Sequence, residues 1–133
     1  MSGQTEPVTL DEFLKVASTL LGTQEEVLAT LPKLGQVDFA LAAPNSGIGN
    51  EYFYPTIPEK AAALLFGIIQ AHALPDANKR SAWVTTNVWL RRNGFDLTFD
   101  EVDAEATITT VASSVMSRES LTDWLAEGIV PLK

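Results

Sequence analysis

The uninterrupted apolar segment Ala61–Ile69 restricts the fold of this chain more than any other feature. Pro58 and Glu59, just before it, are residue types favoured in the first turn of a helix. A helix that is apolar on nearly every side has to be buried all round. The sequence therefore predicts a central helix over about 58–73, with other elements packed around it.

A second central helix is expected over about 77–93, because Pro75 interrupts the preceding pattern and Gly94 provides a stop. Apolar residues at helical spacing also predict a helix from Leu10 to Gly22, with Thr9 as its N-cap. Start signals of the same kind fall at Thr23, for a helix limited by Pro32, and at Asp100 and Ser117. A short helical turn is expected over 37–43.

The segment 44–55 differs in character, since it combines prolines, glycines and the aromatic cluster Tyr52–Tyr54. Asn45, Gly47 and Gly49 favour turns. We expect a loop or short hairpin here, whose aromatic rings either dock a partner or pack on the core. Strand signals are weak elsewhere, so the predicted fold class is all-α, a compact helical bundle.

Composition limits the class of protein. A chain of 133 residues is the size of one domain, so 1–133 is expected to be a single domain. The absence of cysteine is compatible with a reducing cytoplasm, and no basic leader or apolar run of about 20 residues points to export or to a membrane. The net charge of −8 argues against a nucleic-acid partner. A soluble cytoplasmic protein is expected.

The segment His72–Ala82 is the candidate site, and it reads H-A-L-P-D-A-N-K-R-S-A. It places the only histidine beside a carboxylate, an amide and two cations at a predicted helix start. Imidazole takes up a proton near neutral pH, a carboxylate can hold a divalent cation, and the unpaired amides of a helix N-terminus bind phosphate. Lys79 and Arg80 are unfavourable in a first helical turn unless an anion binds there. The pattern predicts phosphate chemistry.

Each of these residues also has an ordinary structural use. A lone histidine at a helix end more often caps or packs than catalyses. Asp76 is of the residue type that most often serves as an N-cap, and Asn78 alone carries no specificity. Arg91 and Arg92 suit the last turn of a helix, where a structural role suffices for them.

The segment resembles the signature of the Fic/Doc family, commonly H-x-F-x-[D/E]-[G/A]-N-[G/K]-R. The matching residues are His72, Asp76, Ala77, Asn78, Lys79 and Arg80, while Leu74 replaces the usual Phe. The flanking Y-P-T-I-P-E-K-A-A-A from Tyr54 and W-L-R-R-N-G-F from Trp89 are also similar to Doc-like sequences. The resemblance covers about residues 5–128, and the D-A-N-K-R form favours the Doc branch.

The resemblance implies a helical Fic fold in which His72 is the general base that takes the target hydroxyl proton. By position, Asp76 would hold Mg²⁺ on ATP, and the phosphates would lie against Ala77, Asn78, Lys79, Arg80 and Ser81. The loop 44–55 would be a flap that aligns a target segment, through Asn45, Gly47, Gly49 and Tyr52. Doc-like toxins transfer the γ-phosphate of ATP to elongation factor Tu and halt translation, and a separate antitoxin controls them.

Two positions favour phosphate transfer over the AMP transfer of typical Fic enzymes. Those enzymes usually have Gly where this chain has Lys79, and a second Arg where it has Trp83. The inhibitory motif [S/T]-x-x-x-E-[G/N] is absent, because Asp123 stands at its first position. AMP transfer stays as an alternative. So does a catalytically weakened binding protein, since Leu74 fills less volume than Phe beneath the active-site loop.

Overall fold

The computed structural model describes residues 3–133, and helices dominate it, which confirms the predicted helical class. In chain order the elements are α1 (Leu10–Leu21), α2 (Glu25–Leu28), α3 (Leu34–Ala42), the 3₁₀ turn η1 (Ala43–Asn45), β1 (Gly47–Ile48), β2 (Glu51–Tyr52), α4 (Ile57–Ala71), α5 (Asn78–Arg92), β3 (Phe95–Leu97), α6 (Glu101–Ala112), α7 (Arg118–Gly128) and β4 (Ile129–Pro131). In the described part, no helix is both long and apolar enough to cross a bilayer.

The start signals read from the sequence hold for three helices. Thr9 forms a capping box with Glu12, in which each side chain accepts from the other residue's backbone N–H. The Asp100 and Ser117 side chains cap α6 and α7. The prediction at Thr23 was wrong, because α2 has Gln24 at its N-cap and no side-chain cap bond.

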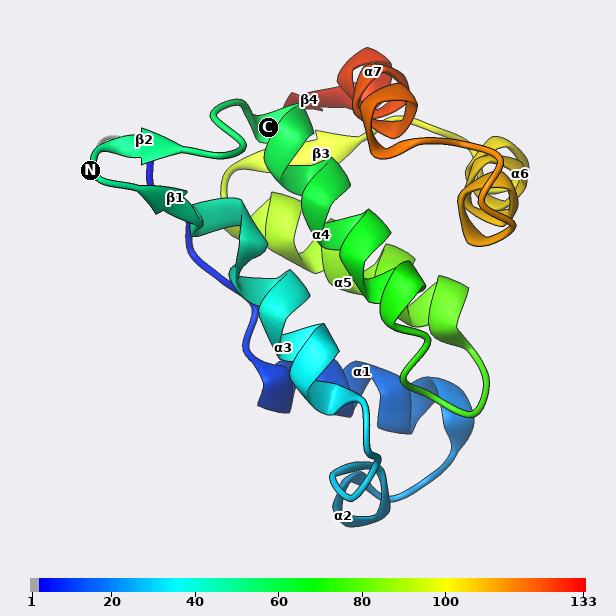
Figure 1. Cartoon of the computed structure of the whole chain (residues 1–133). Coiled ribbons are helices and arrows are strands. Elements are labelled where there is room, and N and C mark those ends of the chain that lie inside the picture. The colour runs from blue at the N-terminus through cyan, green and yellow to red at the C-terminus, as the bar shows by residue number, and fades with distance from the viewer. Residues whose placement is uncertain (1–2) are drawn as a thin grey trace.

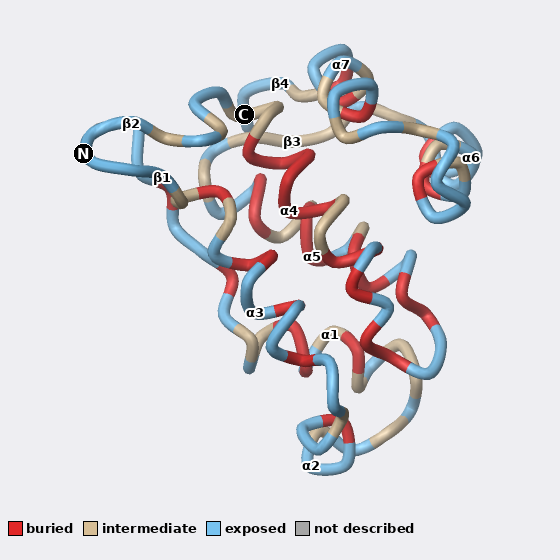
Figure 2. The backbone as a smooth tube through the Cα atoms, viewed as in Figure 1, coloured by how far each residue is buried: buried red, intermediate tan, exposed pale blue. Residues whose placement is uncertain are grey.

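Helix α4 is the centre of the molecule, and its start differs slightly from the prediction. Thr56 caps the helix through a second capping box with Glu59, so Pro58 is the second helical residue rather than the first. Its middle is fully covered, as Figure 2 shows by the red stretch along α4, with Ala61 and Leu65 at 0% exposure. This burial agrees with the all-round apolar pattern.

The neighbours of α4 are α3, α5 and α7, and α5 runs beside it through the middle of Figure 1. Helix α3 approaches most closely at Gly67, where a Cβ atom would stand 2.7 Å from the Cβ of Ala40. At the far end of α5, the Arg92 guanidinium pairs with the Glu12 carboxylate on α1. This pair and the Thr9 backbone N–H lower the pKa of Glu12 from 4.5 to about 2.

Two short antiparallel ladders accompany the helices. The β1–β2 hairpin falls inside the segment predicted to be a loop or hairpin. The second ladder, β3 with β4, pairs Leu97 with Ile129 and Phe95 with Pro131 and was not predicted. Its partners lie more than thirty positions apart in the chain, so neither segment carries a local hairpin signal.

Candidate functional site

The predicted site forms the turn between α4 and α5. His72 ends α4 in the left-handed region, with φ 45°, and Ala77 precedes α5 there too, with φ 59°. This conformation costs a residue with a Cβ roughly 1–2 kcal/mol. Such strain persists only where surrounding structure enforces it, and it clusters at functional sites.

The Asn78 side chain holds this turn together. Its Oδ1 accepts the Leu74 N–H at 3.0 Å and its Nδ2 donates to the Leu74 carbonyl at 2.8 Å, and both residues are buried. The carboxamide expected to bind phosphate is therefore occupied by the backbone of the turn. Of the polar N–H groups of Asn78, the backbone N–H at the helix start is the one that remains for an anion.

The first turn of α5 is open to an anion. Its N-cap is Ala77, which has no side chain to accept the first amide hydrogens, so these donors point outward with partial positive charge. Lys79 and Arg80 are exposed beside them, and neither forms an ion pair within residues 3–133. The turn therefore concentrates unpaired positive charge on an acidic chain.

His72 and this cationic turn line one hollow of about 410 Å³, which we call the His72 hollow. Its other walls come from the ends of α4 and α6, and its lining is Ile69, His72, Pro75, Asp76, Ala77, Asn78, Lys79, Arg80, Glu105 and Ala112. The imidazole thus shares one space with the carboxylate and both cations of the predicted site. A base and a phosphate-binding helix start in one hollow can serve proton transfer and phosphoryl transfer together.

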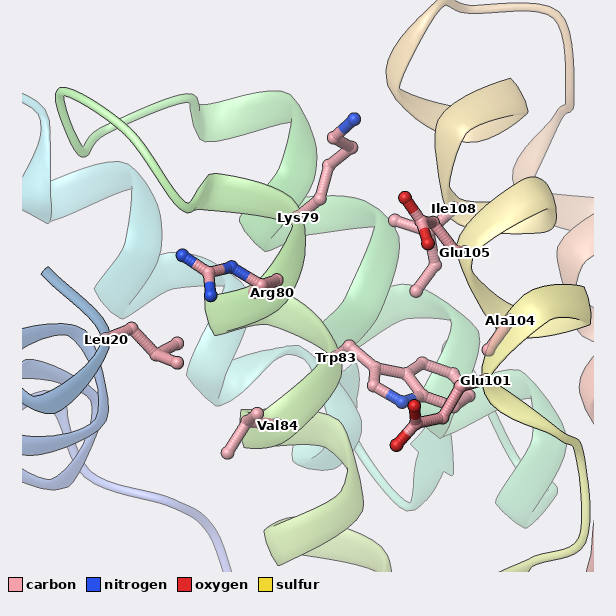
Figure 3. Close-up of a pocket in the computed structure, with 9 residues that line it drawn as sticks. All are labelled: Leu20, Lys79, Arg80, Trp83, Val84, Glu101, Ala104, Glu105 and Ile108. Carbon is pink, nitrogen blue, oxygen red and sulfur yellow. The ribbon is translucent and has the colours of Figure 1, made fainter.

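A second hollow of about 380 Å³ continues along α5, and we call it the α5 groove. Figure 3 shows its lining, which is Leu20, Lys79, Arg80, Trp83, Val84, Glu101, Ala104, Glu105 and Ile108. Helix α5 is the floor, with Leu20 of α1 on one side and α6 on the other (Figure 3). Lys79, Arg80 and Glu105 belong to both hollows, so the two spaces join at the start of α5.

Asp76 fits the magnesium role that the sequence suggested, with a limit. Its Oδ1 accepts the Ala77 N–H at 2.7 Å, and its other oxygen takes part in no hydrogen bond among residues 3–133. No group of three or more His, Cys, Asp or Glu side chains in that range could hold a metal ion by itself. Mg²⁺ commonly binds one or two carboxylates together with substrate phosphates, so a lone free carboxylate oxygen suits it only alongside a nucleotide.

Ser81 does not reach the site. Its side chain is fully buried and its backbone N–H donates to the Ala77 carbonyl at 2.9 Å, so neither group faces the His72 hollow. The residue lies one turn before Thr85 on the buried side of α5, where both hydroxyls lack a hydrogen-bond partner in the described chain.

The hairpin predicted to be a flap is not brought to the His72 hollow. It lies near the start of α4 in Figure 1, whereas His72 ends the same helix, and 15 helical residues span about 22 Å. Gly47 packs so closely against the Glu51 carbonyl that no Cβ fits, and Gly49 turns the hairpin with φ 62°. These glycines shape the hairpin itself.

The other two predicted flap residues anchor the hairpin. Asn45 accepts from the Thr5 N–H and hydroxyl and donates back to the Thr5 carbonyl. The Tyr52 ring covers the ammonium of Lys60, which is 3.7 Å from the ring centroid and donates to the Pro44 carbonyl. Burial lowers the pKa of Lys60. Both of these predicted flap residues therefore contact other parts of this protein.

Sequence reasoning missed the α6 wall of the two hollows. Glu101, Glu105 and Ile108 lie on one face of α6 by their spacing, yet nothing in the sequence places that face opposite α5. Trp83 could have been found, because it follows Lys79 by four residues and therefore shares its face of α5.

Comparisons with known proteins show the family of this chain. Residues 7–90, which include the whole His72–Arg80 segment, match the model of the Fic/DOC family. A curated relative from Mycolicibacterium smegmatis, named Toxin Doc, is 34% identical over 124 residues, which are 92% of each chain. A match over more than half of the chain, together with a relative that covers nearly all of it, shows the family. The chain belongs to the Fic/Doc family.

Proposed function

We propose that this protein is a Doc-like toxin that transfers the γ-phosphate of ATP to a Ser or Thr hydroxyl of a target protein. The observation that carries the proposal is the His72 hollow, where the single imidazole lines the same space as a helix start without a side-chain cap and two cations that form no ion pair among residues 3–133. The relative named Toxin Doc supports the toxin class, and the family supports group transfer from ATP to protein.

The mechanism assigns one task to each group. His72 takes the proton of the target hydroxyl as its oxygen bonds to the γ-phosphorus, and the bond from that phosphorus to the β–γ bridging oxygen breaks. ADP leaves with that electron pair. The α5 amides, Lys79 and Arg80 stabilise the negative charge on the phosphate oxygens. Asp76 would hold Mg²⁺, which neutralises and orients the phosphates when bound.

The packing of the turn favours an active enzyme over a weakened binding protein. Leu74 is only 3% exposed, and Asn78 binds both of its backbone groups. A turn held at its centre in this way keeps its geometry without the larger Phe ring. We infer that Leu74 fills the position usually taken by Phe and leaves His72 correctly placed.

The proposed target and the proposed inhibitory partner follow from the resemblance. Elongation factor Tu is the proposed target, and blocked translation the proposed outcome. Because Asp123 replaces the Ser or Thr of the internal inhibitory motif, we propose that a separate antitoxin protein provides inhibition. The net charge of −8 argues against binding to a phosphate backbone, so nucleic acid is not proposed as a substrate.

The test uses purified protein, elongation factor Tu and ATP labelled at either the γ- or the α-phosphate. We expect label on the acceptor from γ-labelled ATP alone. His72→Asn should lower the rate on the order of 10²–10⁴-fold, the usual loss of a positioned base, while Asn still tolerates the left-handed backbone. Gln70→Ala, an exposed change in the same helix turn, is the matched control and should retain the rate.

The outcomes separate the alternatives. Label from α-labelled ATP would replace the kinase by an AMP transferase. Transfer that His72→Asn leaves unchanged would refute the base assignment. If ATP binds but neither label reaches protein in a bacterial lysate, the protein is a binding module.

A further inference from the structure

We propose that Glu105 of α6 selects the protein acceptor, by binding a Lys or Arg that lies within about three residues of the Ser or Thr to be phosphorylated. The inference rests on the proposed function, because it assumes that the transfer takes place in the His72 hollow. It deepens that function by naming the class of acceptor segment, which is a hydroxyl residue with a basic neighbour.

The position and charge of Glu105 are the first argument. Among the residues that line the His72 hollow in the described chain, Glu105 is the charged one that does not come from the turn between α4 and α5. It is exposed, and its carboxylate forms no ion pair among residues 3–133. Figure 3 shows the side chain extending from α6 toward α5, with Lys79 on the opposite side. The carboxylate therefore borders the proposed reaction space without an ion-pair partner.

A bound triphosphate makes this carboxylate unfavourable, which is the second argument. In the proposed reaction the phosphate oxygens occupy Lys79 and Arg80. Glu105 then borders the same hollow of about 410 Å³ as the phosphates, and like charges at such short range repel. Glu105 therefore adds nothing to donor binding. A cation on the acceptor segment turns the repulsion into attraction, and the charge of −8 on the chain draws a basic segment in the same sense.

The ends of α4 and α6 limit the distance between that cation and the reacting hydroxyl. The Gln70 side chain donates to the Val111 carbonyl at 3.5 Å, which holds the end of α6 beside the end of α4. Ala112 ends α6 and lines the hollow together with His72, and Glu105 lies two helical turns before it, about 10 Å along the helix. An extended segment advances about 3.3 Å per residue. A basic residue up to about three positions from a hydroxyl at His72 can therefore reach Glu105.

The experiment measures transfer from γ-labelled ATP, at saturating ATP and Mg²⁺, by the full chain to elongation factor Tu and to short peptides. Each peptide contains a single Thr, flanked on both sides by Arg, by Ala or by Glu. We expect kcat/KM for the Arg-flanked peptide to exceed that for the Ala-flanked peptide on the order of tenfold, mainly through KM, since a charge-assisted hydrogen bond contributes about that much.

Three variants show whether Glu105 causes this preference. Glu105→Gln should remove it. Asp103→Asn is the matched control, because it removes the same charge from α6 outside both hollows, and it should keep the preference. Glu105→Lys should reverse the preference in favour of the Glu-flanked peptide, and a misfolded protein could not gain such an activity.

Several results would overturn the assignment. The parent protein could label all the peptides equally or none of them, or Glu105→Gln could keep the preference for Arg. An equal loss for all the peptides in Glu105→Gln, together with a higher Mg²⁺ requirement, would assign Glu105 to the metal instead. In each of these cases, labelling of elongation factor Tu by the parent protein would leave the proposed function standing. A parent protein that labels neither elongation factor Tu nor any peptide would remove both proposals.

Discussion

The role of Asn78 gives the sharpest test of how this site is built. In family terms its carboxamide would contact phosphate, whereas in the structure both polar atoms are bonded to the Leu74 backbone. The change Asn78→Ala separates the two roles. A phosphate ligand matters only when nucleotide is bound, and a structural clamp matters in the free protein.

The size of the effect follows from the two bonds. Asn78→Ala leaves the buried Leu74 N–H and carbonyl without partners, and each such group costs about 1–3 kcal/mol. Partial entry of water reduces the sum, so we expect the free energy of unfolding to fall by about 2–4 kcal/mol. For a chain of this length, that corresponds to a Tm decrease on the order of 10 °C.

The assay uses circular dichroism to monitor urea and thermal unfolding in the absence of nucleotide. Asn87→Ala is the control on the same helix, because Asn87 donates only to the Trp83 carbonyl at 2.8 Å and is partly exposed. That variant should stay within about 0.5 kcal/mol of the parent. If Asn78→Ala matches it, and differs from the parent only in nucleotide affinity, the clamp is refuted.

Three further predictions test the strain, the packing and the charges. Ala77→Gly should raise the free energy of unfolding by about 0.5–1 kcal/mol in urea titrations, because φ is 59° there, whereas Ala106→Gly inside α6 should lower it. Gly67→Ala should destabilise by about 1 kcal/mol through its contact with Ala40, and a stabilised variant would contradict the close packing of α3 and α4. Because the pKa of Glu12 is about 2 when folded and near 4.5 when unfolded, its stabilising pairing is complete above pH 4.5 and is lost as the pH falls toward 2. The urea midpoint should therefore fall more over that range in the parent than in Glu12→Gln, and equal falls would refute the assignment.

The local features of the fold were readable from the sequence where one helix turn contains all the partners. Thr9, Asp100 and Ser117 cap helices through hydrogen bonds to residues three positions later in the chain. The neighbouring residues in the sequence are therefore enough to predict these caps. The all-round apolar pattern of α4 likewise predicts its burial. Two starts differ from the prediction by one residue, since Gln24 rather than Thr23 is the N-cap of α2, and Thr56 caps α4 one residue before the position that Pro58 at the first helical place would indicate.

The sequence by itself determined which residues are candidates for the proposed chemistry, since the His72–Arg80 segment is continuous and its spacing across a helix start is a local property. Only the tertiary structure decided which of their side chains remain free to meet a ligand at the proposed site. It turned the Asn78 carboxamide inward, buried Ser81, placed the hairpin at the far end of α4 and brought Glu105 of α6 into the same hollow as Lys79. The physical reason is that these arrangements depend on packing between segments distant in the chain, and no local pattern of residues encodes which face meets which.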